Sequence, residues 1–306
     1  MSKLQSNDVL STLHSHDRDK NIKFQESGHL YTITTDPLSK YISVTSWNHT
    51  HFQKFDADDI IKKMMRGKSW KEGHKYWGLT SSQIKDIWNK NRDDASGAGT
   101  TIHYEIECFM NNPTLKKDYT HKELYDDYIL KSVKVCIDTN IDIGIDIDID
   151  KKQPIRIHQT KEWSYFLEFI KEFPELKPYR TEWMIYDEEL KLAGSIDMVY
   201  ENPDGTLCIY DWKRSANITK INTWNKFALP YCISQLPDSN FWHYALQLNV
   251  YKAILERKYE KKVTKLRLVK LHPNNEEQTY EILDVPILEK EISQLFEERK
   301  NQLVNL

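Results

Sequence analysis

The sequence predicts an α/β protein of the α+β kind, in which a few strands are flanked by helices. Three strand-like segments lie between residues 179 and 213, and a fourth lies near residues 263–271. The helical segments Phe241–Tyr259 and Val285–Leu303 stand on either side of the fourth strand. The 306 residues include 9 Trp, 17 Tyr and 10 Phe, which need a packed core, so overall disorder is excluded.

The first part of the chain predicts short strands followed by helices. Polar and apolar residues alternate over 22–45, around a turn-like Asp36–Ser39. Asp56 is expected to cap a helix that reaches Met65. A longer helix is expected from Thr80 to Met110, because Gln83 completes a capping box at its start. The small residues of Ser96–Gly99 predict a kink or a break in the middle of that helix.

Residues 137–150 alternate Ile and Asp with a period of two, so a strand there would place carboxylates on one face. Such an acidic ladder could bind metal ions, but charged runs are more often solvated. We interpret the tract as an edge hairpin or a mobile insertion without a chemical role. The expected organisation is a strand and helix elaboration, residues 1–90, packed on a core, residues 91–306, that carries this insertion.

The charge of the chain is unevenly distributed. A net charge of −3 at pH 7 by itself disfavours nucleic acid as a partner, but this total hides the local distribution. Residues 137–150 alone hold five Asp and no basic residue. Residues 60–75 carry six Lys or Arg against one acid, and residues 252–270 carry eight against two. Phosphate binding depends on the local field, so these segments could bind a nucleic acid backbone.

Cysteines and apolar segments exclude several classes of protein. The four cysteines form no Cys-x-x-Cys pair, so neither a disulfide framework nor a cysteine metal cluster is expected. No apolar run reaches the roughly 18 residues that a membrane helix needs. The N-terminus lacks the apolar core of a secretion signal. A cytoplasmic protein without a membrane partner is expected.

One predicted hairpin brings acidic residues together. Asn202–Gly205 is a strong turn signal, and the three-residue loop that it favours pairs Asn202 with Thr206. In this register Asp197 lies opposite Asp211, and Lys213 shares their face of the sheet. Like charges across a ladder are destabilising unless something compensates them, as a divalent cation would. The alternative is a solvent-exposed polar face, but the apolar neighbours favour a buried hairpin, where unpaired charge is costly.

These residues resemble a known family. Gly194-Ser195-Ile196-Asp197, followed after thirteen residues by Asp211-Trp212-Lys213, resembles the signature of the PD-(D/E)XK nuclease superfamily. Two further motifs are similar to helices of the branch that holds RecB, the CRISPR-adaptation nucleases and a mitochondrial exonuclease. These motifs are Gly99-Thr100-Thr101-Ile102-His103 with Glu107, and Gln247-Leu248-Asn249-Val250-Tyr251. The chain also resembles λ-exonuclease-like proteins of large DNA viruses.

The resemblance implies a restriction-endonuclease-like core, a small mixed sheet flanked by helices, and a metal-dependent nuclease. It implies Mg²⁺ or Mn²⁺ as the cofactor, with His103, Asp197 and Asp211 as ligands. Lys213 would orient the attacking water or neutralise charge on the phosphate, and nearby metal ions would lower its pKa. The four-cysteine spacing of the family's iron–sulfur members is absent, so no iron–sulfur cluster is expected.

The resemblance also assigns residues around this centre. Glu107, one helical turn after His103, would bind a second metal ion or a water. Gln247 would support the site or contact a phosphate, and Tyr251 and His243 on the same helix are candidates for DNA contact. The alternative is a core helix that carries some polar residues.

Two further sets of residues are weaker candidates. Glu182 matches an acidic position on the preceding strand, but pairing through a turn at Asp187–Glu189 would place it several residues from Asp197. In the basic segment 60–75, the side chains of Lys62 and Arg66 could contact phosphates and the ring of Trp70 could stack on bases. A solvated helix with core tryptophans is the alternative.

The leading hypothesis is a metal-dependent DNA nuclease, an exonuclease that acts on single- or double-stranded DNA ends. Two alternatives stay open: a non-catalytic DNA-binding module on the same fold, and an RNA hydrolase that processes 5′ ends or caps. The resemblance to nucleases of large DNA viruses also implies that the protein could be encoded by a virus. A recombination or interference protein could then be its partner.

Overall fold

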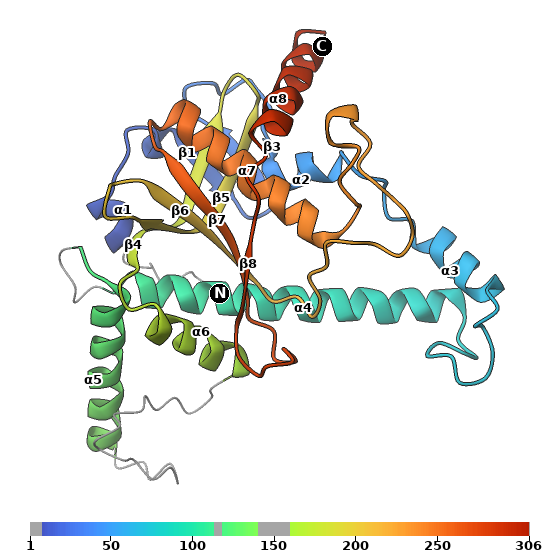
Figure 1. The fold of residues 1–306 in the computed structure, drawn as a ribbon, viewed down its shortest axis with the longest axis horizontal. Coiled ribbons are helices and arrows are strands. Elements are labelled where there is room, and N and C mark those ends of the chain that lie inside the picture. The colour runs from blue at the N-terminus through green and yellow to red at the C-terminus, as the bar shows by residue number, and fades with distance from the viewer. Residues whose placement is uncertain (1–7, 113–117, 140–159, 306) are drawn as a thin grey trace.

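A six-stranded mixed sheet with helices on both faces forms the body of the protein (Figure 1). The computed structural model describes residues 8–112, 118–139 and 160–305. The strands run in the order β3-β5-β6-β7-β8, with β4 paired to β5. Pairs β3–β5 and β6–β7 are parallel and the others are antiparallel, which confirms the predicted fold class. The strands are β3 Ile42–Ser43, β4 Lys177–Asp187, β5 Leu192–Glu201, β6 Leu207–Lys213, β7 Val263–Lys270 and β8 Glu281–Asp284.

Eight helices and a small hairpin complete the described part of the chain. The hairpin consists of β1 Ile22–Gln25 and β2 Leu30–Ile33. The helices are α1 Val9–Leu13, α2 Val44–His49, α3 Ala57–Arg66, α4 Ser81–Met110, α5 His121–Thr139, α6 Lys161–Glu172, α7 Asn240–Lys258 and α8 Glu289–Val304. Helix α8 begins one turn later than predicted, because Val285 still donates its N–H to the carbonyl of Leu266 in β7 (3.0 Å).

The predicted caps of α3 and α4 are confirmed. The carboxylate of Asp56 accepts the N–H of Asp59, and Thr80 and Gln83 form the reciprocal bonds of a capping box. The predicted break at Ser96–Gly99 is wrong, because α4 is one continuous helix. Nothing lies within 4 Å of a side chain built at Gly97 or Gly99, so no close contact requires these glycines. Glycine in a helix costs only about 1 kcal/mol, which a long helix tolerates.

The sheet is buried on both faces. Under α7, with α2 and α8, the core includes Ile185, Ile196, Ile209, Phe241, Leu248 and Ile254. On the α6 side, it includes Ile106, Trp163, Phe166, Met198, Tyr210 and Trp212. Because both faces are apolar, polar groups of the sheet concentrate where its strands end or separate.

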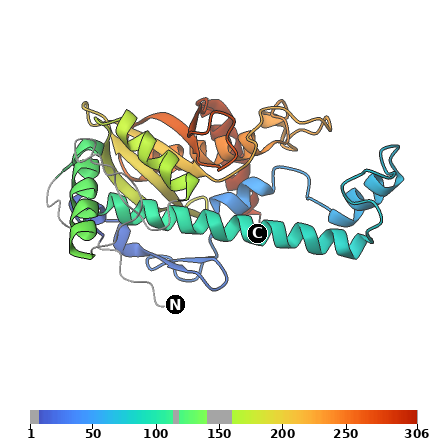
Figure 2. The same cartoon turned by 90° about the horizontal axis from the view of Figure 1, so that it is seen from below.

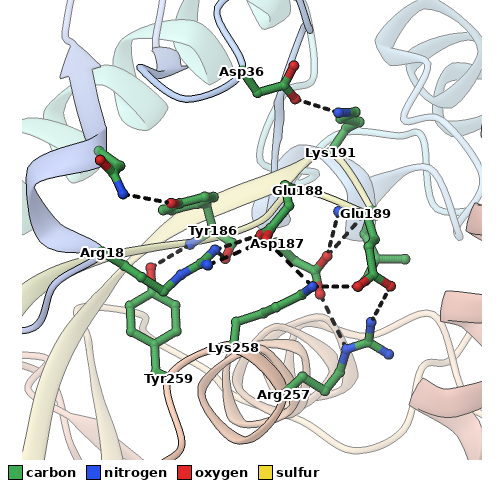
Figure 3. A network of polar contacts seen from close by, with 12 residues as sticks. Arg18, Asp36, Tyr186, Asp187, Glu188, Glu189, Lys191, Arg257, Lys258 and Tyr259 are labelled. Atoms are coloured by element: carbon green, nitrogen blue, oxygen red, sulfur yellow. Dashed lines mark hydrogen bonds and ion pairs between the residues drawn. The ribbon is translucent and has the colours of Figure 1, made fainter.

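A network of charged side chains fixes the turn between β4 and β5 (Figure 3). The fully buried carboxylate of Asp187 accepts the N–H groups of Glu189 (2.9 Å) and Leu190 (3.1 Å) and pairs with Arg257 of α7 (3.3 Å). Arg18 contacts Glu188 (2.6 Å) from the N-terminal segment. The network therefore ties the end of α7 to the strands whose middle carries the candidate site.

Residues 55–88 form an arm, made of α3, the segment after it and the start of α4. Both views show this arm projecting from the body along α4 (Figures 1 and 2). The division of the chain at residue 90 stays a prediction; β3, from the N-terminal part, adds a strand to the main sheet. The Ile/Asp tract lies outside the described residues from position 140 on. Among the helices described, none is long and apolar enough to cross a membrane.

Candidate active site

The hairpin of β5 and β6 has the register that its turn predicts. Gly205 takes the left-handed conformation (φ +79°), and the paired residues run from Glu201 opposite Leu207 to Met198 opposite Tyr210. The pairing ends one step before Asp197 and Asp211, which the same register aligns. On this side of β5, residues 192–193 pair with β3 and residues 198–201 pair with β6, so residues 194–197 between them have no strand partner there among the described residues. The two central strands therefore separate at the two aspartates.

The backbone of Trp212 orients two candidate ligands. Its N–H donates to Oδ2 of Asp197 (3.0 Å), and its carbonyl oxygen lies 3.0 Å from Nε2 of His103 on α4. Because a carbonyl oxygen only accepts, Nε2 carries the proton and donates to it. Nδ1 then faces Asp197 (3.6 Å) and Glu182 (4.0 Å), and in the neutral form of the ring it offers a metal ion a lone pair. A fixed tautomer with a free nitrogen is typical of a metal-ligating histidine.

Glu182 completes this group and lies closer to Asp197 than predicted. Pairs Thr181–Met198 and Trp183–Ile196 flank it, so Glu182 stands directly opposite Asp197. The prediction that several residues separate them is wrong, because residues 188–191 form a longer loop between the strands. Ligand atoms of His103, Glu182 and Asp197 all lie within 4.8 Å of one another. Ser195 donates to the second oxygen of Glu182 (2.9 Å).

Asp211 and Lys213 form an ion pair beside this group. The carboxylate of Asp211 is buried and contacts the ammonium of Lys213, which also lies 4.8 Å from the ring centre of Tyr244. Burial raises the pKa of Asp211 to about 6, although Lys213 opposes the shift. Burial alone would lower the pKa of Lys213, but Asp211 and Asp197 outweigh it and raise that pKa. In this environment Lys213 is a cation.

The charges of the site fit a divalent cation. Partial burial and the neighbouring Asp197 raise the pKa of Glu182 to about 8, since a second negative charge is unfavourable there. Two carboxylates and an imidazole with a free nitrogen are donors that Mg²⁺ and Mn²⁺ accept. A bound cation would offset the repulsion between the carboxylates. Asp211 is not in the three-residue group, although it stands next to it in the sheet.

Helix α7 packs directly on this part of β5. Gln247 donates to the hydroxyl of Tyr251 (3.1 Å), and the Tyr251 ring lies against Gly194. A side chain at Gly194 would place its Cβ 2.7 Å from Cε1 of Tyr251, so only glycine fits. The two family motifs are therefore in contact three residues from Asp197.

Gly194→Ala is expected to lower both the thermal stability and the cleavage rate, because the new methyl group displaces the Tyr251 ring. Such overpacking costs about 1–3 kcal/mol. The matched control is Gly97→Ala on α4, where the space is open and alanine should leave stability unchanged or raise it by about 1 kcal/mol. Melting temperatures and cleavage rates of both variants test this, and equal melting temperatures would contradict the packing argument.

The remaining predicted residues lie in other surroundings. Glu107 is close enough for its charge to add to the raised pKa of Glu182. His243 stacks on Phe52 (ring centres 3.9 Å apart) and contacts Asp238 (2.9 Å), so its ring already has partners. The arm carries the other three predicted residues, Lys62 and Arg66 on α3 and Trp70 after it, and Figure 1 shows α3 well apart from strands β4, β5 and β6.

A mixed sheet whose central strands separate at clustered carboxylates, beside a half-buried lysine, is the arrangement expected of a metal-dependent phosphodiester hydrolase. The model of the PD-(D/E)XK nuclease superfamily matches residues 89–305, and the chain belongs to this family. No curated protein matches the chain. Membership of the family suggests a nuclease that uses divalent metal ions and acts on DNA.

Proposed function

We propose that the protein is a deoxyribonuclease that removes nucleotides from DNA ends and uses Mg²⁺ or Mn²⁺. The observation that carries this is the convergence of His103, Glu182 and Asp197 beside the Asp211–Lys213 ion pair. The branch that the helix motifs resemble is rich in enzymes that act on DNA ends. A non-catalytic binding module would not need Asp197, Asp211 and Lys213 together, and this chain has all three.

His103, Glu182 and Asp197 would hold the metal ion, and Asp211 is the next carboxylate available to it. The bound ion would supply a water of lowered pKa and neutralise charge on the phosphate. Trp212 holds two of the ligands in place through its N–H and its carbonyl group. These backbone bonds preserve the geometry of the ligands in the absence of substrate.

Lys213 acts as a cation rather than as a base. The two aspartates keep it protonated, so its ammonium can face the negative charge that develops on the phosphate during attack. Gln247 lies beside the neighbouring strand β5, where the buried Tyr251 packs against Gly194, and its half-buried amide can contact the phosphate. Proton removal from the attacking water falls to the carboxylates or to bulk solvent.

The test is cleavage of end-labelled linear DNA, covalently closed circular DNA and RNA, each with Mg²⁺, Mn²⁺ or EDTA. We expect small products from linear DNA, no cleavage of circles, loss of activity in EDTA and its return with Mn²⁺. Nicking of closed circles would contradict exonuclease action. A preference for RNA would favour the RNA-processing alternative, and no cleavage with either metal would contradict the nuclease itself.

A further inference from the structure

Residues 214–239, here called the aromatic segment, follow Lys213 directly and expose large apolar side chains. Trp224 is 79% exposed and Tyr231 is 92% exposed. Three more side chains of the segment are exposed, namely those of Ile221, Phe227 and Leu229. Side chains of this size are usually buried, so several exposed within one short segment indicate a binding site.

Hydrogen bonds hold the aromatic segment in this conformation. The Asn222 side chain accepts the N–H groups of Trp224 (3.0 Å) and Lys226 (3.1 Å) and donates to the carbonyl of Asp238 (3.0 Å). Leu229 donates its N–H to the carbonyl of His51, just after α2 (2.7 Å). The exposure of Trp224 therefore results from a defined turn.

Basic residues outnumber acidic ones in the aromatic segment by three to one, although Arg214 is paired with Glu162. Glu298 of α8 contacts Cys232, next to Tyr231. Between Lys213 and Asp238 the segment has basic residues and no acidic one. The pKa of Asp59 on α3 is lowered, mainly by its hydrogen bond with Lys63. The charge of Lys226 in the aromatic segment contributes to the same shift, so Lys226 lies near the arm. Both views show the aromatic segment and α3 at the same end of the molecule (Figures 1 and 2). The arm adds further exposed rings, Phe55 and Trp77, and the six basic residues of 60–75.

This chemistry matches a nucleic acid with unpaired bases. Lysines attract the phosphates, and exposed rings stack on bases whose faces are free. A duplex buries the faces of its bases, so it would satisfy the lysines but not the rings. An apolar protein partner would satisfy the rings but not the lysines of the segment and the arm.

We propose that the aromatic segment and the arm bind the unpaired bases of a single strand that leads to Lys213. This inference deepens the proposed nuclease function and rests on it for the position of the strand end. Its substrate class is single-stranded DNA, or the unpaired end of a duplex.

The experiment compares Trp224→Leu/Tyr231→Leu with the matched pair Trp224→Phe/Tyr231→Phe. Leucine keeps apolar volume without a ring, whereas phenylalanine keeps the ring. Leu38→Ala, at a 96% exposed leucine outside the segment, is the surface control. Binding of a fluorescent oligothymidylate of about 20 nucleotides and of a blunt duplex of equal length is measured in EDTA, so that cleavage plays no part.

We expect the leucine pair to bind oligothymidylate at least about tenfold more weakly, since each stacked base contributes about 1–3 kcal/mol. The phenylalanine pair, the Leu38 control and all duplex affinities should stay within about threefold of the original protein. Unchanged oligothymidylate affinity in the leucine pair, as a protein-docking surface would give, overturns the proposal. An equal loss in both pairs, or an equal loss for duplex, also overturns it. Failure of the nuclease proposal would instead appear as normal binding without cleavage.

Discussion

Asp197→Asn is expected to lower the single-turnover rate of DNA cleavage by roughly 10³-fold while the protein stays folded. Asparagine keeps the shape of the side chain, and its oxygen can still accept the N–H of Trp212. It removes one of the two carboxylates that face the free nitrogen of His103. The remaining carboxylate and imidazole bind a divalent cation weakly, so Mn²⁺ affinity should fall together with the rate.

The control is Asp204→Asn, the same change at the exposed turn of the same hairpin. Asp204 bonds only to Thr206 among the contacts described, and asparagine suits that turn. Calorimetric Mn²⁺ binding, single-turnover rates and melting temperatures are measured for both variants. Full activity of Asp197→Asn would refute the metal centre. Lost activity with unchanged Mn²⁺ binding would place the ion elsewhere.

Local chemistry explains why much of the fold could be predicted. The turn at Asn202–Gly205 fixes the register of its hairpin, and that register aligns Asp197 with Asp211 one step beyond the last pair. The capping box at Thr80 likewise fixes the start of α4. Each of these signals lies within a few residues of the feature that it determines.

Features that depend on distant contacts could not be predicted in the same way. Ile196 packs under α7 but Met198 packs toward α6, so the normal alternation of β5 breaks at Asp197. Opposite this point Glu182 has a positive φ of 43°, which no local pattern indicates for a glutamate. The contact of Tyr251 with Gly194 joins residues far apart in the sequence. The role of Glu182 therefore emerges only from the folded strands.

The pKa of Lys213 illustrates the same limit for electrostatics. Metal ions nearby would lower it, as the sequence predicts, but the structure adds Asp211 in direct contact and Asp197 close by. Both carboxylates favour the ammonium form. The balance between these effects depends on whether a cation is bound, so it couples the lysine to the metal.

Lys213→Met is expected to reduce the single-turnover rate by roughly 10²–10³-fold, the usual contribution of one well-placed charged donor. Methionine has a similar length and no charge, so it fills the space beside Tyr244. Mn²⁺ affinity should not fall and should rise slightly, because the variant removes a positive charge next to the cation site. Without metal the variant should be less stable, since Asp211 loses the partner of its buried carboxylate.

The opposite interpretation makes Lys213 a clamp that binds the phosphate equally in substrate and transition state. In that case DNA affinity falls and the rate at saturating DNA survives. Mn²⁺ calorimetry, DNA binding and single-turnover rates, measured on Lys213→Met and on the charge-preserving Lys213→Arg, separate the two. If Lys213 stabilises the charge that develops on the phosphate, Lys213→Arg should cleave faster than Lys213→Met, because arginine keeps the positive charge. An unchanged saturating rate in Lys213→Met would refute the catalytic role.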